Sequence, residues 1–212
     1  MAAPAAAEGI LAVLARSHQL RLDDLHRRAL DPAADPRAAL LARDFERVLA
    51  SESPRPDVQL LVVDGAVQAE TLAGHVVVVS ASLAVLADGE RLFILAHELG
   101  HAQMGHWGEL CAVYARFIPD EVTPEVTNAV APQLGRAAST LVHGHEYAAD
   151  AYAMRTIRTL GYGLDSAAGA LHLMPNLGDS STHPASRKRL ARLQIMGDGE
   201  VRSAAVGPLS GD

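Results

Sequence analysis

The sequence predicts an α+β fold that is mostly helical and contains a small three-stranded sheet. Hydrophobic residues make up 49% of the 212 residues but aromatic residues only 4%. The core must therefore consist mainly of Ala, Leu and Val, which favours helix packing. Three short β-rich runs follow one another between residues 58 and 79, and a helical pattern comes directly after the last of them. We expect the sheet to lie beside that helix.

The charge balance and the single cysteine exclude several classes of protein. A net charge of −7 argues against a general binder of nucleic acid or anionic membranes. Because Cys111 is the only cysteine, neither an intrachain disulfide nor a cysteine-based zinc cluster can form. The first eight residues lack the basic region of a secretory signal, and no apolar run reaches the length of a membrane span. We therefore expect a cytoplasmic protein without a transmembrane segment.

The chain is expected to divide into three parts: an N-terminal helical segment (1–54), one main domain (55–197) and a flexible tail (198–212). The tail is rich in Gly, Ser and Ala. In the first part, the apolar residues of 9–30 have amphipathic helical spacing. Two Asp-Pro pairs end that pattern before a second helix over about 37–49. Nothing in this part carries chemistry, so we interpret it as a cap or as a surface for a partner or for self-association.

Three β-rich runs begin the main domain. Residues 58–63 form the first, Asp64-Gly65 provides a turn, and residues 66–71 can return as the second. The third is the apolar run Val76, Val77, Val78 and Val79, followed by Ser80. A small antiparallel or mixed sheet packed on helices is expected. If one edge of this sheet lies beside a functional site, that edge can pair with an extended chain.

The motif His97-Glu98-Leu99-Gly100-His101 lies in a predicted helix that Asp88 is suited to cap. The two histidines are one turn apart and differ by only about 40° around the helix, so both imidazoles can reach one cation. Glu98 lies about 60° from His101, which is near such an ion but poorly placed to bind it. A carboxylate there can take a proton from a water that the metal activates, as a general base.

The alternative is a chance occurrence of two histidines on a packing helix. Burying His, Glu and His on an apolar helix costs desolvation energy unless something satisfies these groups, and a metal ion would do so. On a continuous helix His106 lies about 180° from His97, so we expect it to point away from the metal. A third ligand must therefore come from elsewhere in the chain.

A second motif lies in residues 140–159, which predict a helix. Glu146 and Asp150 are four residues apart on one face, and alanines beside them allow close approach of another helix. Glu146 can supply an oxygen to the metal, while Asp150 accepts a hydrogen bond from the far nitrogen of a ligand histidine. The alternative is an exposed acidic pair. His143, near the same face, is a reserve ligand.

Shorter elements connect these motifs. Residues 80–86 predict a short helix, and the three prolines of 109–142 indicate short helices with breaks. Asp165 can cap a helix that runs through Leu173. The turn Thr182-His183-Pro184 is expected to start the last helix, which ends at Gly197.

These motifs, in this order, resemble the gluzincin peptidases that include the HtpX-type heat-shock proteases and the CAAX-prenyl proteases. The resemblance covers about residues 58–195 and implies a zincin-type metallopeptidase fold. It implies that His97, His101 and Glu146 bind one zinc ion. It also implies that Glu98 activates the water and that Asp150 orients a ligand histidine.

Two further residues match this family near the C-terminal end of the resemblance. His183 matches a histidine that comes near the site, where it could stabilise the oxyanion of the tetrahedral intermediate. Arg189 matches an arginine of the same segment, which would hold that histidine or a substrate carbonyl. The alternatives are that His183 caps its helix and that Arg189 forms a surface ion pair.

The sequence departs from these relatives in two ways. Many of them place membrane-spanning helices around the catalytic unit, whereas residues 109–142 carry several charges here. This indicates a soluble minimal form, so membrane-protein or prenylated substrates are not carried over. The family also tends to show an Asn-Ala-Phe-like segment before the edge strand, where this chain has Gln68-Ala69-Glu70.

The expected function is hydrolysis of peptide bonds in a peptide or protein substrate by a zinc-dependent endopeptidase. An extended substrate would pair with the edge formed by Val76, Val77, Val78, Val79 and Ser80. The alternative is a latent or non-catalytic zinc-binding regulatory module, with the N-terminal helices as its working surface. In a latent form His143, His145 or Cys111 could fill the open coordination position.

Overall fold

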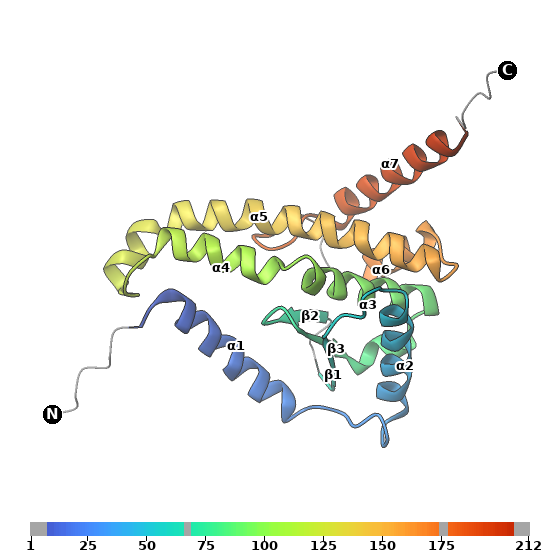
Figure 1. The fold of residues 1–212 in the computed structure, drawn as a ribbon, viewed down its shortest axis with the longest axis horizontal. Coiled ribbons are helices and arrows are strands. Elements are labelled where there is room, and N and C mark those ends of the chain that lie inside the picture. Colours follow the sequence, from blue (N-terminus) through green and yellow to red (C-terminus); the bar gives the residue numbers. More distant parts are fainter. Residues whose placement is uncertain (1–7, 66–68, 174–177, 206–212) are drawn as a thin grey trace.

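The computed structural model describes residues 8–65, 69–173 and 178–205 (Figure 1). It confirms an α+β fold that is mostly helical and contains a small three-stranded sheet. The elements in chain order are α1 (Ile10–His26), α2 (Pro36–Ala50), β1 (Gln59–Val63), β2 (Ala69–Leu72), β3 (Val76–Ser80), the 3-10 helix η1 (Ala81–Val85), α3 (Asp88–Gln103), α4 (His106–Phe117), α5 (Pro124–Thr159), α6 (Leu164–Leu173) and α7 (Ser186–Ala205).

The sheet is mixed and its strand order is β1-β3-β2. Strand β1 runs parallel to β3, and β2 runs antiparallel to it. The prediction that Val76–Ser80 forms an edge is therefore wrong, because β3 is paired on both sides and all five of its residues are buried. An unbroken apolar run is typical of a strand covered on both faces. The edges are β1 and β2.

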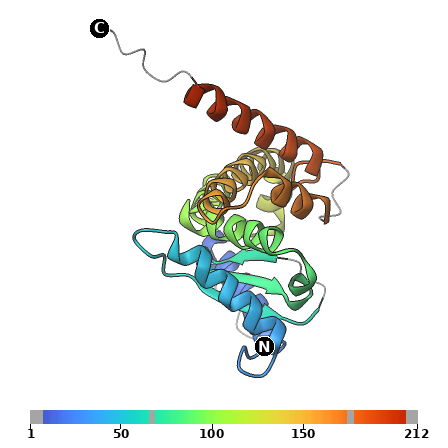
Figure 2. The ribbon, with the colours of Figure 1, turned by 90° about the vertical axis from the view of Figure 1, so that its right-hand side faces the viewer.

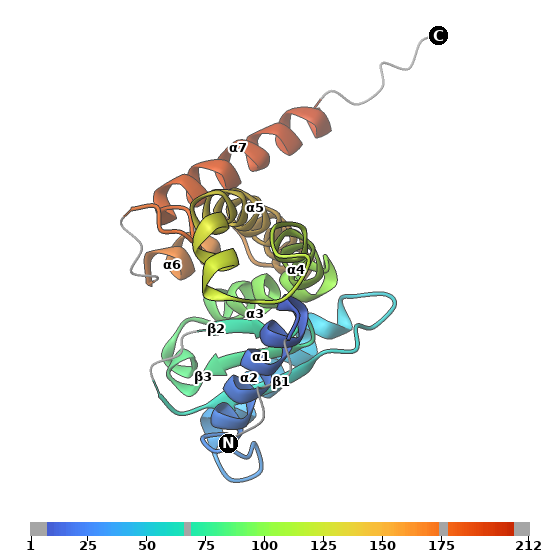
Figure 3. The same cartoon turned by 90° about the vertical axis from the view of Figure 1, so that its left-hand side faces the viewer.

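Helices cover both faces of this sheet. Val77 and Val79 share the main core with residues of α2 and α3. Val76 and Val78 point to the other face, where they pack against Leu22 and Leu25 of α1. Figures 2 and 3 view the molecule from opposite sides, with α2 in front of the strands in one and α1 in the other. The alternating side chains of one strand thus join two separate hydrophobic clusters.

Helix α3 runs through the centre of the molecule between the sheet and α5 (Figure 1). Its residues from Arg91 to Gly100 are all buried. Gly100 allows α5 to approach closely, since a Cβ atom there would lie 3.0 Å from Cδ1 of Tyr152. Ala149 and Ala153 on α5 are fully buried. Small residues on both helices therefore set a short distance between the two motifs found in the sequence.

The start of α3 is fixed by charged side chains from α2. Ala87, rather than Asp88, is the N-cap residue, and its N–H donates to the Glu90 carboxylate at 3.0 Å. Asp88 instead accepts hydrogen bonds from Arg47, at 3.0 and 3.1 Å, and from Arg91 at 2.7 Å. Helix α2 contributes to the same core as α3. Helix α2 is therefore packed in the same core as α3, the helix that carries the His-Glu-Leu-Gly-His motif.

Two sequence predictions about the helices after α3 are wrong in part. The short helices with breaks expected over 109–142 hold for α4 and for the break at 118–123, but Pro132 is interior to α5, one helix of 36 residues. Leu134, two residues after this proline, is buried with Ile10 of α1 and with Ile118, the residue that follows α4. Helix α7 begins at Ser186, after the turn expected to start it, and continues past Gly197 to Ala205. No helix in the described part of the chain is long and apolar enough to cross a bilayer.

Candidate metal centre

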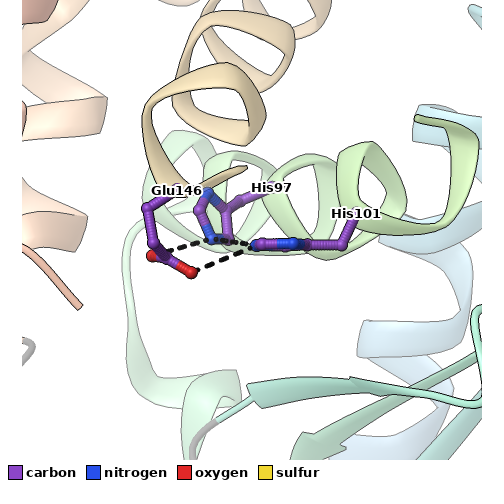
Figure 4. Close-up of side chains that lie close together, drawn as sticks. All are labelled: His97, His101 and Glu146. Carbon is purple, nitrogen blue, oxygen red and sulfur yellow. Dashed lines mark hydrogen bonds and ion pairs between the residues drawn. The ribbon is translucent and has the colours of Figure 1, made fainter. Parts of the chain in front are cut away.

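Three side chains from two helices converge at one point (Figure 4). His97 and His101 come from α3, and their Nε2 atoms are 3.1 Å apart. Glu146 comes from α5; its Oε1 lies 3.3 Å from Nε2 of His101 and its Oε2 3.6 Å from Nε2 of His97. One potential ligand atom from each residue lies within 4.8 Å of the others. Among the described residues this is the one His, Cys, Asp or Glu group with such an arrangement.

The chemistry of these donors fits a metal ion. Nδ1 of His97 lies 3.1 Å from Oδ1 of Asp150, an acceptor, so the imidazole proton belongs on Nδ1 and the lone pair on Nε2. Oε2 of Glu146 is buried, and its ion pair with Nη1 of Arg189 at 3.0 Å leaves it without a regular hydrogen bond among the described residues. Two lone pairs and a carboxylate that face one another repel unless a cation lies between them. A set of two imidazoles and one carboxylate is suited to zinc.

Arg189 of α7 holds the acidic side chains in place. It donates two hydrogen bonds to Asp150, at 2.7 and 2.6 Å, and its Nη1 lies 3.0 Å from Oε2 of Glu146. The side chains of all three residues are at most 4% exposed. The alternatives of an exposed acidic pair and a surface ion pair are therefore wrong.

Burial and charge oppose each other in setting the pKa values at this centre. Burial alone would raise the pKa of Glu146, but the neighbouring rings of His101 and His97 and the charge of Arg189 hold it well below its ordinary value. Burial would likewise raise the pKa of Asp150, yet Arg189 and His97 lower it. For His97 the opposite holds: burial lowers its pKa, and the bond to Asp150 together with Glu146 raises it above 6.5 overall. Both carboxyl groups are therefore ionised at neutral pH.

Glu98 lies beside the ligand group without belonging to it. Its side chain is buried to 7% exposure, and its Oε2 accepts a hydrogen bond from the Thr71 hydroxyl at 2.7 Å. The same hydroxyl lies 2.8 Å from the backbone oxygen of Glu98. Thr71 is in strand β2 and was not identified from the sequence, because only the folded sheet brings it to α3. The carboxylate of Glu98 is thus held in one orientation by a group from another element.

His106 lies outside the group of potential ligands, as predicted, but closer to it than the sequence indicated. We expected it to point away from the metal because we assumed one continuous helix, but α3 ends at Gln103 and the chain turns at Gly105 with φ 67°. This turn brings Nδ1 of His106 to 2.9 Å from Nδ1 of His101. Burial and the neighbouring histidines lower the pKa of His106 to about 4, so its neutral ring can accept the proton of His101. Nε2 of His101 then presents its lone pair to the metal position.

The other histidines of the second motif have partners of their own. Nε2 of His143 lies 2.8 Å from the backbone oxygen of Ser180, and His145 pairs with Glu109 at 2.7 Å. The His145 ring also stacks on His106 with a centroid distance of 3.9 Å. His183 lies near the ligand group, with its Nε2 3.7 Å from Oε1 of Glu146 and its side chain 49% exposed. It precedes α7 by three residues, so it does not begin that helix.

A cleft of about 220 Å³ gives solvent access to this centre. Strand β2 forms one side, and α4 and α5 form the other. The lining residues are Ala69, Glu70, Thr71, Gly74, Glu98, His101, His106, Trp107, Leu110, Val142, His145, Glu146 and His183.

The candidate site combines a His-Glu-Leu-Gly-His helix, a potential third ligand from a second helix and an open cleft alongside. The profile of peptidase family M48 matches residues 35–196, about three quarters of the chain. The chain belongs to this family. Comparisons with curated proteins and with solved structures gave no significant match. The family match includes α2 and begins after α1.

Proposed function

We propose that the protein is a zinc-dependent endopeptidase in which His97, His101 and Glu146 hold one zinc ion and Glu98 is the general base. The convergence of three metal-binding atoms beside a separate carboxylate in an open cleft carries this proposal. Membership of a metallopeptidase family supports it. The closer relation to HtpX-type and CAAX-prenyl proteases stays a prediction, as does a cytoplasmic location.

Each group in the site has a distinct task in this mechanism. When bound, zinc supplies a Lewis acid that polarises the scissile carbonyl and lowers the pKa of a water. Glu98 takes a proton from the attacking water and gives it to the leaving amine. His183, at the rim of the cleft, can donate a hydrogen bond to the carbonyl oxygen as negative charge develops there. Asp150 fixes the ring of His97, and Arg189 fixes Asp150.

The substrate would lie along β2 instead of β3. Strand β2 is paired with β3 on one side only, and three of its residues line the cleft. Its free side can form main-chain hydrogen bonds with an extended peptide. This replaces the edge at Val76–Ser80 that the sequence predicted.

The proposal is tested with β-casein, an unstructured protein, and zinc-loaded enzyme. We expect cleavage that stops when 1,10-phenanthroline removes the metal and returns when one equivalent of zinc per chain is restored. Mass spectrometry of the products measures both steps. Stoichiometric zinc binding without any cleavage would contradict the proposal and favour the latent or non-catalytic zinc module.

Replacement of Thr71 by Val is expected to lower kcat without changing zinc affinity. The substitution removes the hydroxyl that holds Glu98 but keeps the shape of the side chain and the backbone of β2. A hydrogen bond to a charged group is worth about 1.5–3 kcal/mol, so the expected loss is about tenfold to a hundredfold. Steady-state kinetics on β-casein would measure it. Thr71→Ser keeps the hydroxyl and serves as the control; equal kcat values in both variants would reject this role.

A further inference from the structure

We propose that α1 supports the substrate-binding cleft, because its residue His18 fixes the β2–β3 turn and Trp107 along the edge on which a peptide would lie. The inference rests on the proposed peptidase function. Helix α1 precedes residue 35, where the family match begins, and the sequence predicted no chemistry for it. Neither the sequence motifs nor the family match therefore assigns a role to α1.

His18 joins two elements that are otherwise separate. Its Nδ1 accepts a hydrogen bond from the backbone N–H of Ala73 at 3.0 Å. Its ring stacks on the indole of Trp107, with centroids 3.9 Å apart and planes inclined by 25°. Burial lowers the pKa of His18, although Glu70 opposes this, so the ring is neutral at neutral pH and Nδ1 is free to accept. One side chain of α1 thus links the β2–β3 turn to α4.

The turn needs such support. Ala73 has φ 51°, a left-handed conformation that residues with a Cβ atom rarely adopt, and Gly74 follows with φ 75°. His75 closes the turn by donating its N–H to the Leu72 oxygen at 3.2 Å. The hydrogen bond to His18 gives the Ala73 N–H a partner in this conformation. Without it the turn can relax toward more common backbone angles.

Relaxation of the turn would change the cleft. Gly74 and Trp107 both line the cleft, and they are packed so closely that a Cβ atom on Gly74 would lie 3.4 Å from Cβ of Trp107. A second contact from α1 acts on the same strand, since Arg21 pairs with Glu70 at 2.8 Å. Glu70 is itself a cleft residue. Helix α1 therefore contacts strand β2 through Glu70 and the turn after β2 through Ala73.

Three substitutions separate the two contacts of His18. His18→Ala removes both, His18→Asn keeps an acceptor near the position of Nδ1, and His18→Phe keeps an aromatic ring on Trp107. Gln19→Ala, at an exposed neighbour on the same helix, is the matched control. All four are made in the active protein and in the Glu98→Gln background, and all are loaded with zinc. Melting temperatures identify any variant that does not fold.

Two measurements report on substrate binding. The first is KM and kcat for β-casein cleavage. The second is the Kd of fluorescein-labelled β-casein for the Glu98→Gln proteins, measured by anisotropy. We expect His18→Ala to raise KM and Kd about tenfold, as for one lost hydrogen bond, with kcat changed less than about twofold. His18→Asn should recover most of this loss, and His18→Phe should not.

A third measurement follows the contact itself. Trp107 is the only tryptophan, so acrylamide quenching of its fluorescence reports on the stacked ring with or without metal. Quenching should increase in His18→Ala and His18→Asn and stay near the wild-type value in His18→Phe.

The outcomes separate this inference from the proposed function. If His18→Ala and Gln19→Ala give the same KM and Kd, α1 does not support the cleft and the inference is overturned, whatever the activity. If no protein cleaves casein but the His18 substitutions weaken binding as expected, the peptidase proposal fails and the role of α1 stands. A folding defect in His18→Ala leaves the decision to His18→Asn and His18→Phe, which must differ in Kd for the inference to hold.

Discussion

Glu98→Gln is expected to lower kcat by about 10²–10⁴-fold, the usual contribution of a positioned general base. The amide keeps the size of the side chain and can still accept the hydrogen bond from Thr71, but it cannot take a proton from water. Because Glu98 lies outside the group formed by His97, His101 and Glu146, zinc content should stay at one ion per chain. Cleavage kinetics and elemental analysis of the same preparation would measure both quantities.

The control for this substitution is Glu46→Gln on α2, which makes the same chemical change at a side chain that is 61% exposed. It should leave cleavage unchanged. Turnover within tenfold of wild type in zinc-replete Glu98→Gln protein would remove Glu98 from the mechanism. Loss of zinc from this variant would instead make Glu98 a ligand.

Arg189→Met is expected to destabilise the metal-free protein by about 3–5 kcal/mol, because it leaves charged groups buried without a partner. Arg189 is 2% exposed and is the cationic partner of both Asp150 and Glu146. Methionine fills much of the same volume but brings no charge. Urea denaturation of the metal-free protein would measure the loss of unfolding free energy. The loss should be smaller in the zinc-loaded protein, because the ion supplies positive charge to Glu146.

Arg187→Met is the matched control, since Arg187 is exposed on the same helix two residues earlier. It should change the unfolding free energy by less than about 0.5 kcal/mol. An equal, small effect of both substitutions would show that Arg189 does not balance the buried carboxylates. A large effect that zinc does not reduce would show that Arg189 stabilises packing alone.

Local patterns in the sequence identified the parts of the site that lie on single helices. His97 and His101 are one turn apart on α3, and Glu146 and Asp150 are one turn apart on α5, so helical spacing alone places each pair on one face. The alanines beside Glu146 correctly indicated a close approach of another helix. The structure brings the two pairs together, with His97 3.1 Å from Asp150.

Features that depend on pairing between distant segments could not be predicted in this way. The three strands were found, but their spatial order follows from the crossover between β1 and β3, which leaves no trace in the spacing of residues. Thr71 reaches Glu98 only because β2 is the strand beside α3. His106 lies closer to His101 than predicted because one left-handed residue, Gly105, interrupts the helix between α3 and α4. His18 gave no signal, since a single histidine on an amphipathic helix has no pattern.

The residues of the site are far apart along the chain, from Thr71 to Arg189. A folding intermediate that contained only the sheet and α3 would bring both histidines together but would lack Glu146, Asp150 and the arginine that balances their charge. Closing such large loops costs entropy before the contacts are made. Hydrolytic competence is thus a property of the whole folded chain. A partly folded chain would lack the complete site and would not cleave other chains. An unfolded chain would lack it as well.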